Sequence, residues 1–499
     1  MAVDLKIWSD ETRWRSARAD KVAWLIDSQA YFSAAYDALL KARRSVLLLG
    51  WGFDPRTRLS PDGGVDGGES DEIGKVLLRL TELNPNLDVR VLVWKSSLPI
   101  SATQEFFPHR ARKWFEGTGV KFHLDDAVPI GACHHQKLLV IDDEVAITGG
   151  GDFATDRWDS VVHRDDDVRR LHHDHSHHPP RHEVMVMVGG QAARELGNLA
   201  RERWARAVDE VSAAGPPSDG PNPWPGNVRS DLAGIDVHIS RTEPAWRHHP
   251  AIREIRRLTR DSLFAAKKFI YLENQYFTSP LVAEALAARL SEPYGPEVVL
   301  ITTLQAPSWF DRLTMDRLRS VMIRRLHEAD VFGRFRAYSP VTSGGKPIIV
   351  HSKVTIIDDD IVRIGSANLN NRSFGFDTEL ELGLQAKNDA ERAIIRHLRG
   401  SLVGHFMARD AEAVERAMGT DDSLSRAIEV LNRHGRLLPL SPTWLSPLAR
   451  FIADFHLGDP TSPKDSFRPF MRRRFLDEQV REIAAESGML RFINSDQNP

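Results

Sequence analysis

The chain has little of three things that would point to particular classes of protein. Its single cysteine, Cys133, excludes an intramolecular disulfide and fits a reducing compartment. The residues after Met1 become charged at once and lack the basic and apolar regions of a secretory signal peptide. No run approaches the roughly 18 apolar residues that a membrane-spanning helix needs. The sequence therefore predicts a cytoplasmic protein, which would meet lipid only as a peripheral protein at the inner membrane face.

A strong charge of one sign is also missing. The formal net charge is −3 over 499 residues, of which 27% are charged and 41% are hydrophobic. Proteins that bind nucleic acid through their overall charge are strongly basic, so the composition disfavours a nucleic-acid partner. Any basic site must be local, and the apolar content is sufficient for a large core.

Short apolar runs that end in turn residues predict strands, and wider apolar spacing predicts helices. In the first part of the chain we expect a helix over 23–42 and strands over 45–53, 88–94, 120–124, 138–141 and 145–148. The order recurs later, with a helix over 249–268 and strands over 269–277, 297–302, 335–338, 348–357 and 361–364. This repetition predicts an α/β fold of two duplicated domains, each a mixed sheet flanked by helices, with the active site at their interface.

Proline marks the boundaries. Five prolines between residues 216 and 225 indicate a linker, because such a segment cannot form a regular element. We therefore expect a first catalytic half over 1–215, a linker over 216–227, a second half over 228–410 and a helical extension over 411–499. The extension contains an amphipathic stretch from Trp444 to Phe455 and a basic run at 472–474. These segments either dock on an anionic bilayer or form an ordinary helical cover for the second half.

One short pattern occurs at matching places in the two halves. It reads His-x-Lys, four residues, Asp, and then six residues to a Gly. Its residues are His135, Lys137, Asp142 and Gly149 in the first half, and His351, Lys353, Asp358 and Gly365 in the second. One match alone would be weak, whereas two matches in a repeated frame are a strong signal.

The residue types suit a phosphodiester. A His and a Lys two apart on a strand point to the same face, so two paired halves would place two imidazoles and two ammonium groups around one cavity. One neutral histidine can attack phosphorus and form a phosphohistidine, while the other protonates the leaving oxygen and later activates water or an alcohol. We expect Lys137, Lys353 and Asn368 to hold the non-bridging oxygens, and Gly149 and Gly365 to let the backbone approach phosphate. This chemistry requires no metal and no cofactor.

The motifs and their flanking segments resemble the phospholipase D superfamily over roughly residues 28–384. The segments 149–159, 270–277 and 365–379 are similar to those of its phosphatidylcholine-cleaving members. The resemblance implies that His135 is the nucleophile and His351 the acid. It also implies that a carboxylate of the opposite half orients each histidine, Glu379 for His135 and Glu183 for His351.

The resemblance also implies roles for other residues of the two motif segments. It implies that Asp142 and Asp358 are structural and that Gly365, Ser366 and Asn368 bind the substrate phosphate. The first half has Gly150 and Asp152 where the second has Ser366 and Asn368. Because a carboxylate would repel phosphate, we expect Asp152 to point away from the site.

Several alternatives stay open. The resemblance implies hydrolysis or transphosphatidylation of phospholipid headgroups, with a synthase of cardiolipin or phosphatidylserine type, a nucleic-acid phosphodiesterase and a non-catalytic lipid-binding relative as the other candidates. Both motifs lie in one chain, so a monomer should be competent. Cys133 is either a reactive thiol near the site or an inert buried one. The segment with His172, His173, His175, His177 and His178 is either a metal site or a variable surface loop.

Overall fold

The computed structural model describes residues 7–61, 70–96, 108–210, 220–419, 422–443 and 446–495. Three predicted features fall partly outside these ranges: the start of the chain, linker residues 216–219, and Trp444 with Leu445 of the amphipathic stretch. Within the described part of the chain, no helix is both long and apolar enough to span a membrane.

The elements follow the chain in three groups. The first half contains β1 (Arg15–Ile26), α1 (Asp27–Leu40), β2 (Ser45–Gly50), α2 (Ile73–Leu83), β3 (Asp88–Trp94), α4 (Pro108–Trp114), β4 (Val120–Asp125), β5 (Leu138–Ile141), β6 (Val145–Gly149), β7 (Arg181–His182), β8 (Val184–Gly189) and α5 (Gln191–Val208). The second half contains β9 (Leu232–Glu243), β10 (Ile252–Arg253), α6 (Glu254–Ala265), β11 (Phe269–Glu273), α7 (Pro280–Leu290), β12 (Glu297–Ile301), α8 (Trp309–Leu313), α9 (Met315–Ala329), β13 (Phe335–Pro340), β14 (Ile349–Val350), β15 (Val354–Ile357), β16 (Ile361–Gly365), α10 (Asn371–Gly375), β17 (Glu379–Gln385) and α11 (Asp389–Phe406). The remainder contains α12 (Ala411–Met418), α13 (Leu424–Leu431), β18 (Leu437–Pro439), α14 (Pro447–Asp454) and α15 (Pro469–Ser495).

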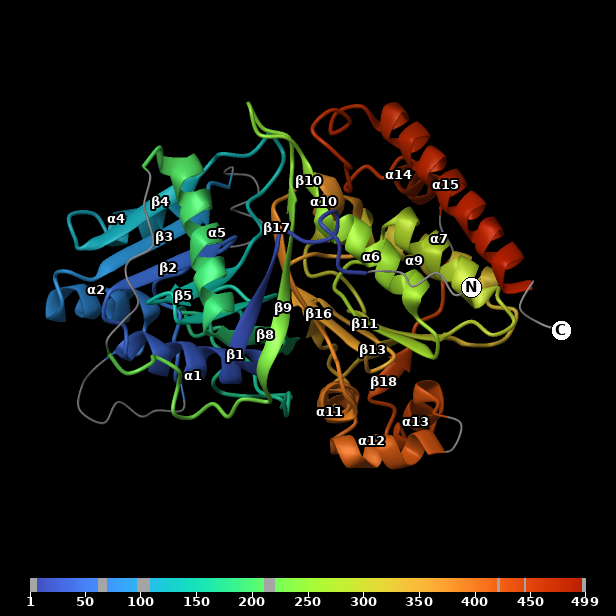
Figure 1. Cartoon of the computed structure of the whole chain (residues 1–499), viewed down its shortest axis with the longest axis horizontal. Helices are drawn as coiled ribbons and strands as arrows, with labels where there is room; N and C mark the ends of the chain where they lie inside the picture. Colours follow the sequence, from blue (N-terminus) through green and yellow to red (C-terminus); the bar gives the residue numbers. More distant parts are fainter. Residues whose placement is uncertain are drawn as a thin grey trace.

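One mixed sheet of 16 strands runs through the molecule (Figure 1). Its order is β18-β13-β12-β11-β15-β16-β17-β9-β1-β8-β6-β5-β2-β3-β4, with β10 paired to β9. The expectation of a separate sheet in each half is wrong, because β1 and β9 pair antiparallel at the centre, from Arg15 opposite Ile239 to Val22 opposite Leu232. Outward from this pair, each side has antiparallel strands followed by three parallel strands, and on the second side β18 then adds an antiparallel edge.

Helices cover both faces of the sheet. On one face, α5, α11, α12 and α13 pack on a single core cluster that extends across both halves. On the other face the core is divided, with α1, α2 and α4 over the first half and α6, α7, α9 and α15 over the second. The shared core and the β1–β9 pair join the halves into one body, with the blue-to-green half on one side and the yellow-to-red half on the other (Figure 1).

Most predicted strands are present, and two have the predicted bounds, β3 and β5. The predicted helix over 23–42 began too early, because residues 23–26 are the end of β1 and α1 begins at Asp27. The extension after residue 410 is mostly helical, but its β18 adds an edge strand beside β13. Four long strands were missed from the sequence, β1, β8, β9 and β17.

The motif aspartates occupy equivalent tight turns. Asp142 has a φ of 55° and Asp358 a φ of 54°, in the left-handed region that Asp tolerates better than most residues. The Asp142 carboxylate accepts hydrogen bonds from the backbone N–H groups of Arg43, Arg44 and Ser45 at 2.8–2.9 Å. Asp358 accepts the equivalent bonds from residues 267–269. Each aspartate therefore ties the turn after a motif strand to the start of the neighbouring strand, β2 or β11.

We predict that Asp142→Ala lowers the free energy of unfolding by about 2–4 kcal/mol, because three backbone donors lose their acceptor. Urea unfolding followed by circular dichroism would measure the change. Asp126→Ala is the matched control, since the Asp126 side chain is 64% exposed. An unchanged midpoint for Asp142→Ala would show that the carboxylate is not structural.

Candidate active site

The two motifs lie side by side although 216 positions separate His135 from His351 in the sequence. We predicted that the His and Lys of each motif lie on a strand. They lie instead directly before β5 or β15. Each lysine turns back on its own motif, and Lys137 Nζ donates to the carbonyl oxygen of His135 at 3.1 Å. Lys353 Nζ makes the equivalent bond to the carbonyl oxygen of His351 at 2.5 Å.

Backbone hydrogen bonds hold each motif against the opposite half. The N–H of His135 donates to the Thr378 carbonyl at 3.0 Å, and the N–H of Thr378 donates to the Cys133 carbonyl at 3.0 Å. On the other side, β7 pairs in parallel with β14, and the N–H of His351 donates to the His182 carbonyl at 2.8 Å. Each motif histidine is therefore placed beside the residue that follows its pairing partner, Glu379 or Glu183.

Each motif histidine contacts a carboxylate from the other half. His135 Nδ1 lies 2.9 Å from Glu379 Oε2, and His351 Nδ1 lies 2.7 Å from Glu183 Oε1. A carboxylate beside Nδ1 favours the tautomer in which Nδ1 carries the proton and Nε2 keeps its lone pair. The His135–Glu379 contact is a hydrogen bond, whereas His351 and Glu183 lie in ion-pair range without forming a hydrogen bond.

The two carboxylates are held differently. Ser366 and Ser373 both donate their hydroxyls to Glu379, Ser373 at 2.6 Å. Glu183 receives no such bond, because Gly150 stands where the second half has Ser366. A Cβ at residue 150 would lie 2.8 Å from Glu183 Oε2 and 2.7 Å from the His351 carbonyl. Close packing therefore requires glycine here, and the Glu183 carboxylate lacks the hydroxyl support that Glu379 has.

Burial dominates the electrostatics of the site. Burial and the cations of Lys137 and Lys353 lower the pKa of His135 well below its usual value. Burial and the cations of Lys353 and Arg181 do the same for His351. Burial lowers the pKa of Lys353 to about 7 and raises that of Glu379 to about 7, although the two serine hydroxyls oppose the rise. These shifts favour the neutral form of the imidazoles of His135 and His351.

Asp152 does not point away from the site, as the sequence had led us to expect. Its Oδ2 lies 3.2 Å from Lys137 Nζ, and its Oδ1 accepts the N–H groups of Trp51 and Gly52 at 2.9 and 3.2 Å. The carboxylate is thus balanced by a lysine and two backbone donors. As a result, the two motif lysines are not equivalent, because Lys137 has a carboxylate partner.

The geometry changes the interpretation of three residues expected to contact phosphate. The Ser366 hydroxyl donates its only proton to Glu379, so Ser366 positions a carboxylate. A Cβ at Gly365 would lie 2.3 Å from the Leu380 carbonyl, and one at Gly149 would lie 2.5 Å from the Val184 carbonyl. Close contact with β17 and β8 is therefore sufficient to explain both glycines, and their approach to phosphate stays a prediction. Asn368 Oδ1 has no hydrogen-bond partner among the described residues, and the side-chain NH2 group, which can donate to a phosphate oxygen, keeps Asn368 a candidate for binding the substrate.

A pocket of about 600 Å³ lies next to these residues. Trp51 and Gly52, which hold Asp152, form part of its wall, together with Arg157 and Arg181. These two arginines are buried and flank Asp156 at 2.7 and 3.0 Å. Trp158, by contrast, belongs to the core. In the histidine-rich segment, His173, His175 and His177 are exposed. His172, His178 and the exposed His173 border the pocket.

Two functional neighbours were missed from the sequence. Ser373 lies six residues before the glutamate that it supports, within a segment that had already been singled out. Asp459 lies far along the chain, between α14 and α15, and accepts the backbone N–H groups of Asn371 and Arg372 at 3.0 and 2.9 Å. It fixes the start of α10 and with it Ser373, and no local pattern marks it.

Parts of this sequence are similar to known proteins. The family model "Cardiolipin synthase, PLD-like domain" matches residues 260–400. Phospholipase D2 of Bos taurus is 22% identical over 74% of this chain and 49% of its own length. Phospholipase D alpha 4 of Arabidopsis thaliana is 24% identical over 74% of this chain and 62% of its own length. The chain thus spans less than two thirds of these curated relatives.

Among solved structures, the phosphatidylserine synthase of Haemophilus influenzae Rd KW20 has a similar fold. The two structures superpose with a TM-score of 0.52 at 12% sequence identity. The match covers 84% of this chain and 95% of the other.

We predict that Cys133 reacts slowly in the folded protein. Its side chain is buried, and burial together with Asp377 raises the pKa of the thiol well above its usual value. The rate of labelling by a chromogenic disulfide at pH 8 should be about a hundredfold lower in the native chain than in denaturant. Because Cys133 is the only cysteine, the assay needs no variant. Equal rates would show that the thiol is accessible beside the site.

Proposed function

Because the chain belongs to the phospholipase D superfamily, we propose that it transfers the phosphatidyl group of a glycerophospholipid to water or to an alcohol. The observation that carries this proposal is the reciprocal pairing of two motif histidines with carboxylates of the opposite half, at 2.9 and 2.7 Å. Binding alone would not require two oriented imidazoles. We assign hydrolysis and alcohol exchange to one site, since both pass through the same covalent intermediate.

In the first step, the Nε2 lone pair of His135 attacks phosphorus, and the bond from phosphorus to the headgroup oxygen breaks. His351 in its protonated form gives its Nε2 proton to that oxygen, so the headgroup leaves as an alcohol. The phosphate of the lipid brings a negative charge near Lys353 and Arg181. That charge offsets the cations that disfavour protonation of His351, so substrate binding prepares the acid.

In the second step, neutral His351 removes a proton from water or from an acceptor alcohol. The resulting oxygen nucleophile attacks phosphorus, and the bond to His135 breaks. The product is phosphatidic acid with water and a phosphatidyl alcohol with an alcohol. Lys137, Lys353 and Asn368 stabilise the non-bridging oxygens as charge develops in both steps.

The unequal support of the two glutamates favours His135 as the nucleophile. A phosphohistidine carries positive charge on its ring, so its partner should be a well-fixed carboxylate. Glu379 meets this need, because two hydroxyls donate to it. Glu183, without such donors, suits a histidine that alternates between acid and base.

The acceptor distinguishes a hydrolase from a synthase. A synthase of the cardiolipin or phosphatidylserine type would use the same two steps with a bound alcohol in place of water. The pocket that Trp51, Arg157 and Arg181 line is a candidate for the headgroup or the acceptor, because it offers two buried arginines and the Asp156 carboxylate between them as polar groups. We propose hydrolysis and exchange as the default activity and a dedicated synthase as the alternative.

We also propose that the chain arose by duplication, with catalytic halves over 1–215 and 228–410, a linker over 216–227 and an extension over 411–499. The matching strand order on the two sides of the β1–β9 pair supports this proposal. Because each half supplies the carboxylate for the other's histidine, one complete chain should be active as a monomer.

We propose in addition that the extension touches a lipid surface, from the cytoplasmic side of a membrane. Large apolar side chains are exposed on and between α14 and α15, namely Leu448, Phe451, Phe467, Phe470 and Met471, which are 47–77% exposed. Arg474 beside them is also exposed. Exposed aromatic residues next to cations favour an anionic bilayer.

We predict that His351→Asn lowers phosphatidylcholine turnover in mixed micelles by about a thousandfold. In the unaltered chain, a primary alcohol should divert product from phosphatidic acid to the phosphatidyl alcohol. Rapid quenching with phosphorus-labelled substrate should place the label on His135. His434→Asn is the control, because this histidine is exposed and far from the motifs in the sequence.

Label on His351 would reverse the two assigned roles. Absence of turnover with every phospholipid headgroup and acceptor alcohol would contradict the lipid assignment, and nucleic-acid phosphodiesters would be the next substrates to assay.

We predict that the double change Phe467→Ser and Phe470→Ser weakens binding to vesicles containing anionic lipid by at least about tenfold, because two apolar side chains no longer enter the interface. Co-sedimentation would measure the affinity. Tyr294→Ser is the matched control, because Tyr294 is 86% exposed but lies outside the extension. Equal binding by the double variant and the control would rule out this surface as the contact.

A further inference from the structure

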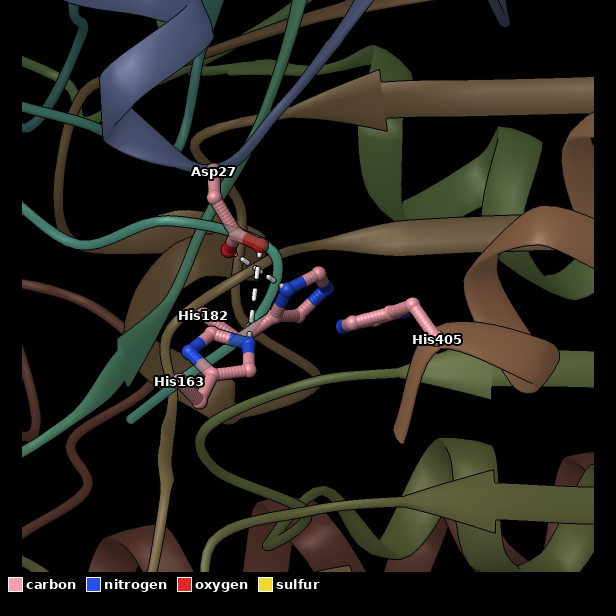
Figure 2. Close-up of side chains that lie close together, drawn as sticks. All are labelled: Asp27, His163, His182 and His405. Carbon is pink, nitrogen blue, oxygen red and sulfur yellow. Dashed lines mark hydrogen bonds and ion pairs between the residues drawn. The ribbon is translucent and has the colours of Figure 1, made fainter. Parts of the chain in front are cut away.

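A second cluster of ionisable side chains lies outside the motifs. It consists of Asp27, His163, His182 and His405, whose candidate ligand atoms all lie within 4.8 Å of one another. The residues come from four separate places: the start of α1, the loop after β6, strand β7 and the last turn of α11. Figure 2 shows the three imidazoles and the carboxylate gathered around a common centre.

The distances suit a small metal ion. His182 Nδ1 lies 2.8 Å from Asp27 Oδ1, and His163 Nε2 lies 3.5 Å from Asp27 Oδ2. A tetrahedral zinc ion with bonds of about 2.0–2.1 Å would separate its ligand atoms by roughly 3.3 Å. Small side-chain shifts would therefore bring these atoms to bonding distance.

Two of the three histidines, His163 and His182, have an outer carboxylate on the nitrogen that faces away from the centre. His163 Nδ1 lies 2.9 Å from Asp159 Oδ2, and His182 Nε2 lies 3.0 Å from Glu273 Oε2. Neither ring nitrogen of His405 has a hydrogen-bond partner in the part of the chain that the structure describes. Metal-bound histidines commonly have such a carboxylate or carbonyl on the nitrogen that does not bind the metal. The outer carboxylates leave His163 Nε2 and His182 Nδ1 facing Asp27, where His182 Nδ1 lies 2.8 Å from Asp27 Oδ1.

Four side-chain atoms of the cluster lack a hydrogen-bond partner among the described residues. They are Asp27 Oδ2 and His163 Nε2, which belong to fully buried side chains, and the two ring nitrogens of His405. Such atoms are rare inside proteins, because leaving them unsatisfied is costly. An ion at the centre would satisfy Asp27 Oδ2, His163 Nε2 and one ring nitrogen of His405 at once.

We propose that Asp27, His163, His182 and His405 bind a first-row divalent ion, zinc foremost, in a structural site. Four protein ligands leave no open position for a substrate, as in other structural zinc sites. The Asp27 carboxylate and the outer carboxylates of Asp159 and Glu273 balance the charge of the ion. The ion takes no part in the phosphoryl transfer, and the proposal stands independently of the proposed function.

The site would connect the two halves next to the active site. His405 belongs to the second half, and the other three ligands belong to the first. The Asp27 carboxylate also accepts the N–H of Glu183 at 3.1 Å, and the Asp27 N–H donates to the Glu183 carbonyl at 2.8 Å. A bound ion would thereby fix the backbone of Glu183, whose carboxylate contacts His351. Asp27 would act as a positioning residue.

The test is metal analysis of the full chain, purified without a metal-affinity tag, together with its thermal unfolding. We expect about one zinc per chain, a lower Tm after removal of the metal with a strong chelator, and recovery of the Tm when zinc is added. Cobalt in place of zinc should show the visible absorption of a tetrahedral ion. His405→Gln should weaken zinc binding by about a hundredfold or more.

A control separates this cluster from the exposed histidines of the 172–178 segment. The triple change His173→Gln, His175→Gln and His177→Gln should leave one zinc per chain. If His405→Gln does not fold, Glu273→Gln replaces it, since loss of an outer partner should still weaken binding by about 10- to 100-fold.

The proposal fails if the purified chain holds less than about a tenth of an equivalent of any divalent metal and its Tm does not respond to added zinc, cobalt, iron or manganese. A protonated His182 between Asp27 and Glu273 would then hold the cluster together. It fails equally if the triple variant loses the zinc while His405→Gln retains it.

Discussion

The contact of each motif histidine with a carboxylate of the opposite half is the constraint on which the site depends. Neither half holds a complete set of groups, because His135 needs Glu379 and His351 needs Glu183. The contacts are possible only because β1 pairs with β9 and because each motif backbone pairs with the segment before the opposite glutamate. These pairings between the halves make the sheet continuous and the core shared, and they also place the two imidazoles.

The two halves are similar in topology but unequal in chemistry. Glu379 has two serine donors, whereas Gly150 leaves Glu183 without an equivalent. Lys137 is paired with Asp152, whereas the matching position of the second half holds Asn368. These differences leave one carboxylate fixed by two hydroxyls and the other without such donors. The asymmetry supports the proposed division of roles between His135 and His351.

Sequence patterns predicted the short central strands well, since β3 and β5 are uniformly apolar and end in turn residues. They missed β1 and β9, because polar residues such as Arg18 and Asp236 interrupt these strands where the two halves meet. The end of β1 was taken for helix, since its last residues are apolar on both faces. Asp152 lies in the site against expectation, because Lys137 offsets the repulsion between its carboxylate and phosphate.

The sequence by itself determined the chemical groups of the site, their spacing within each motif and the strands that carry them. Those features are local, because a strand or turn fixes the direction of side chains only a few residues apart. Tertiary structure alone decided which carboxylate meets which histidine, that Ser366 and Ser373 support Glu379, and that Asp27, His163, His182 and His405 converge. Their separations in the chain are long, so strand register and helix packing set these contacts, and no local spacing encodes them.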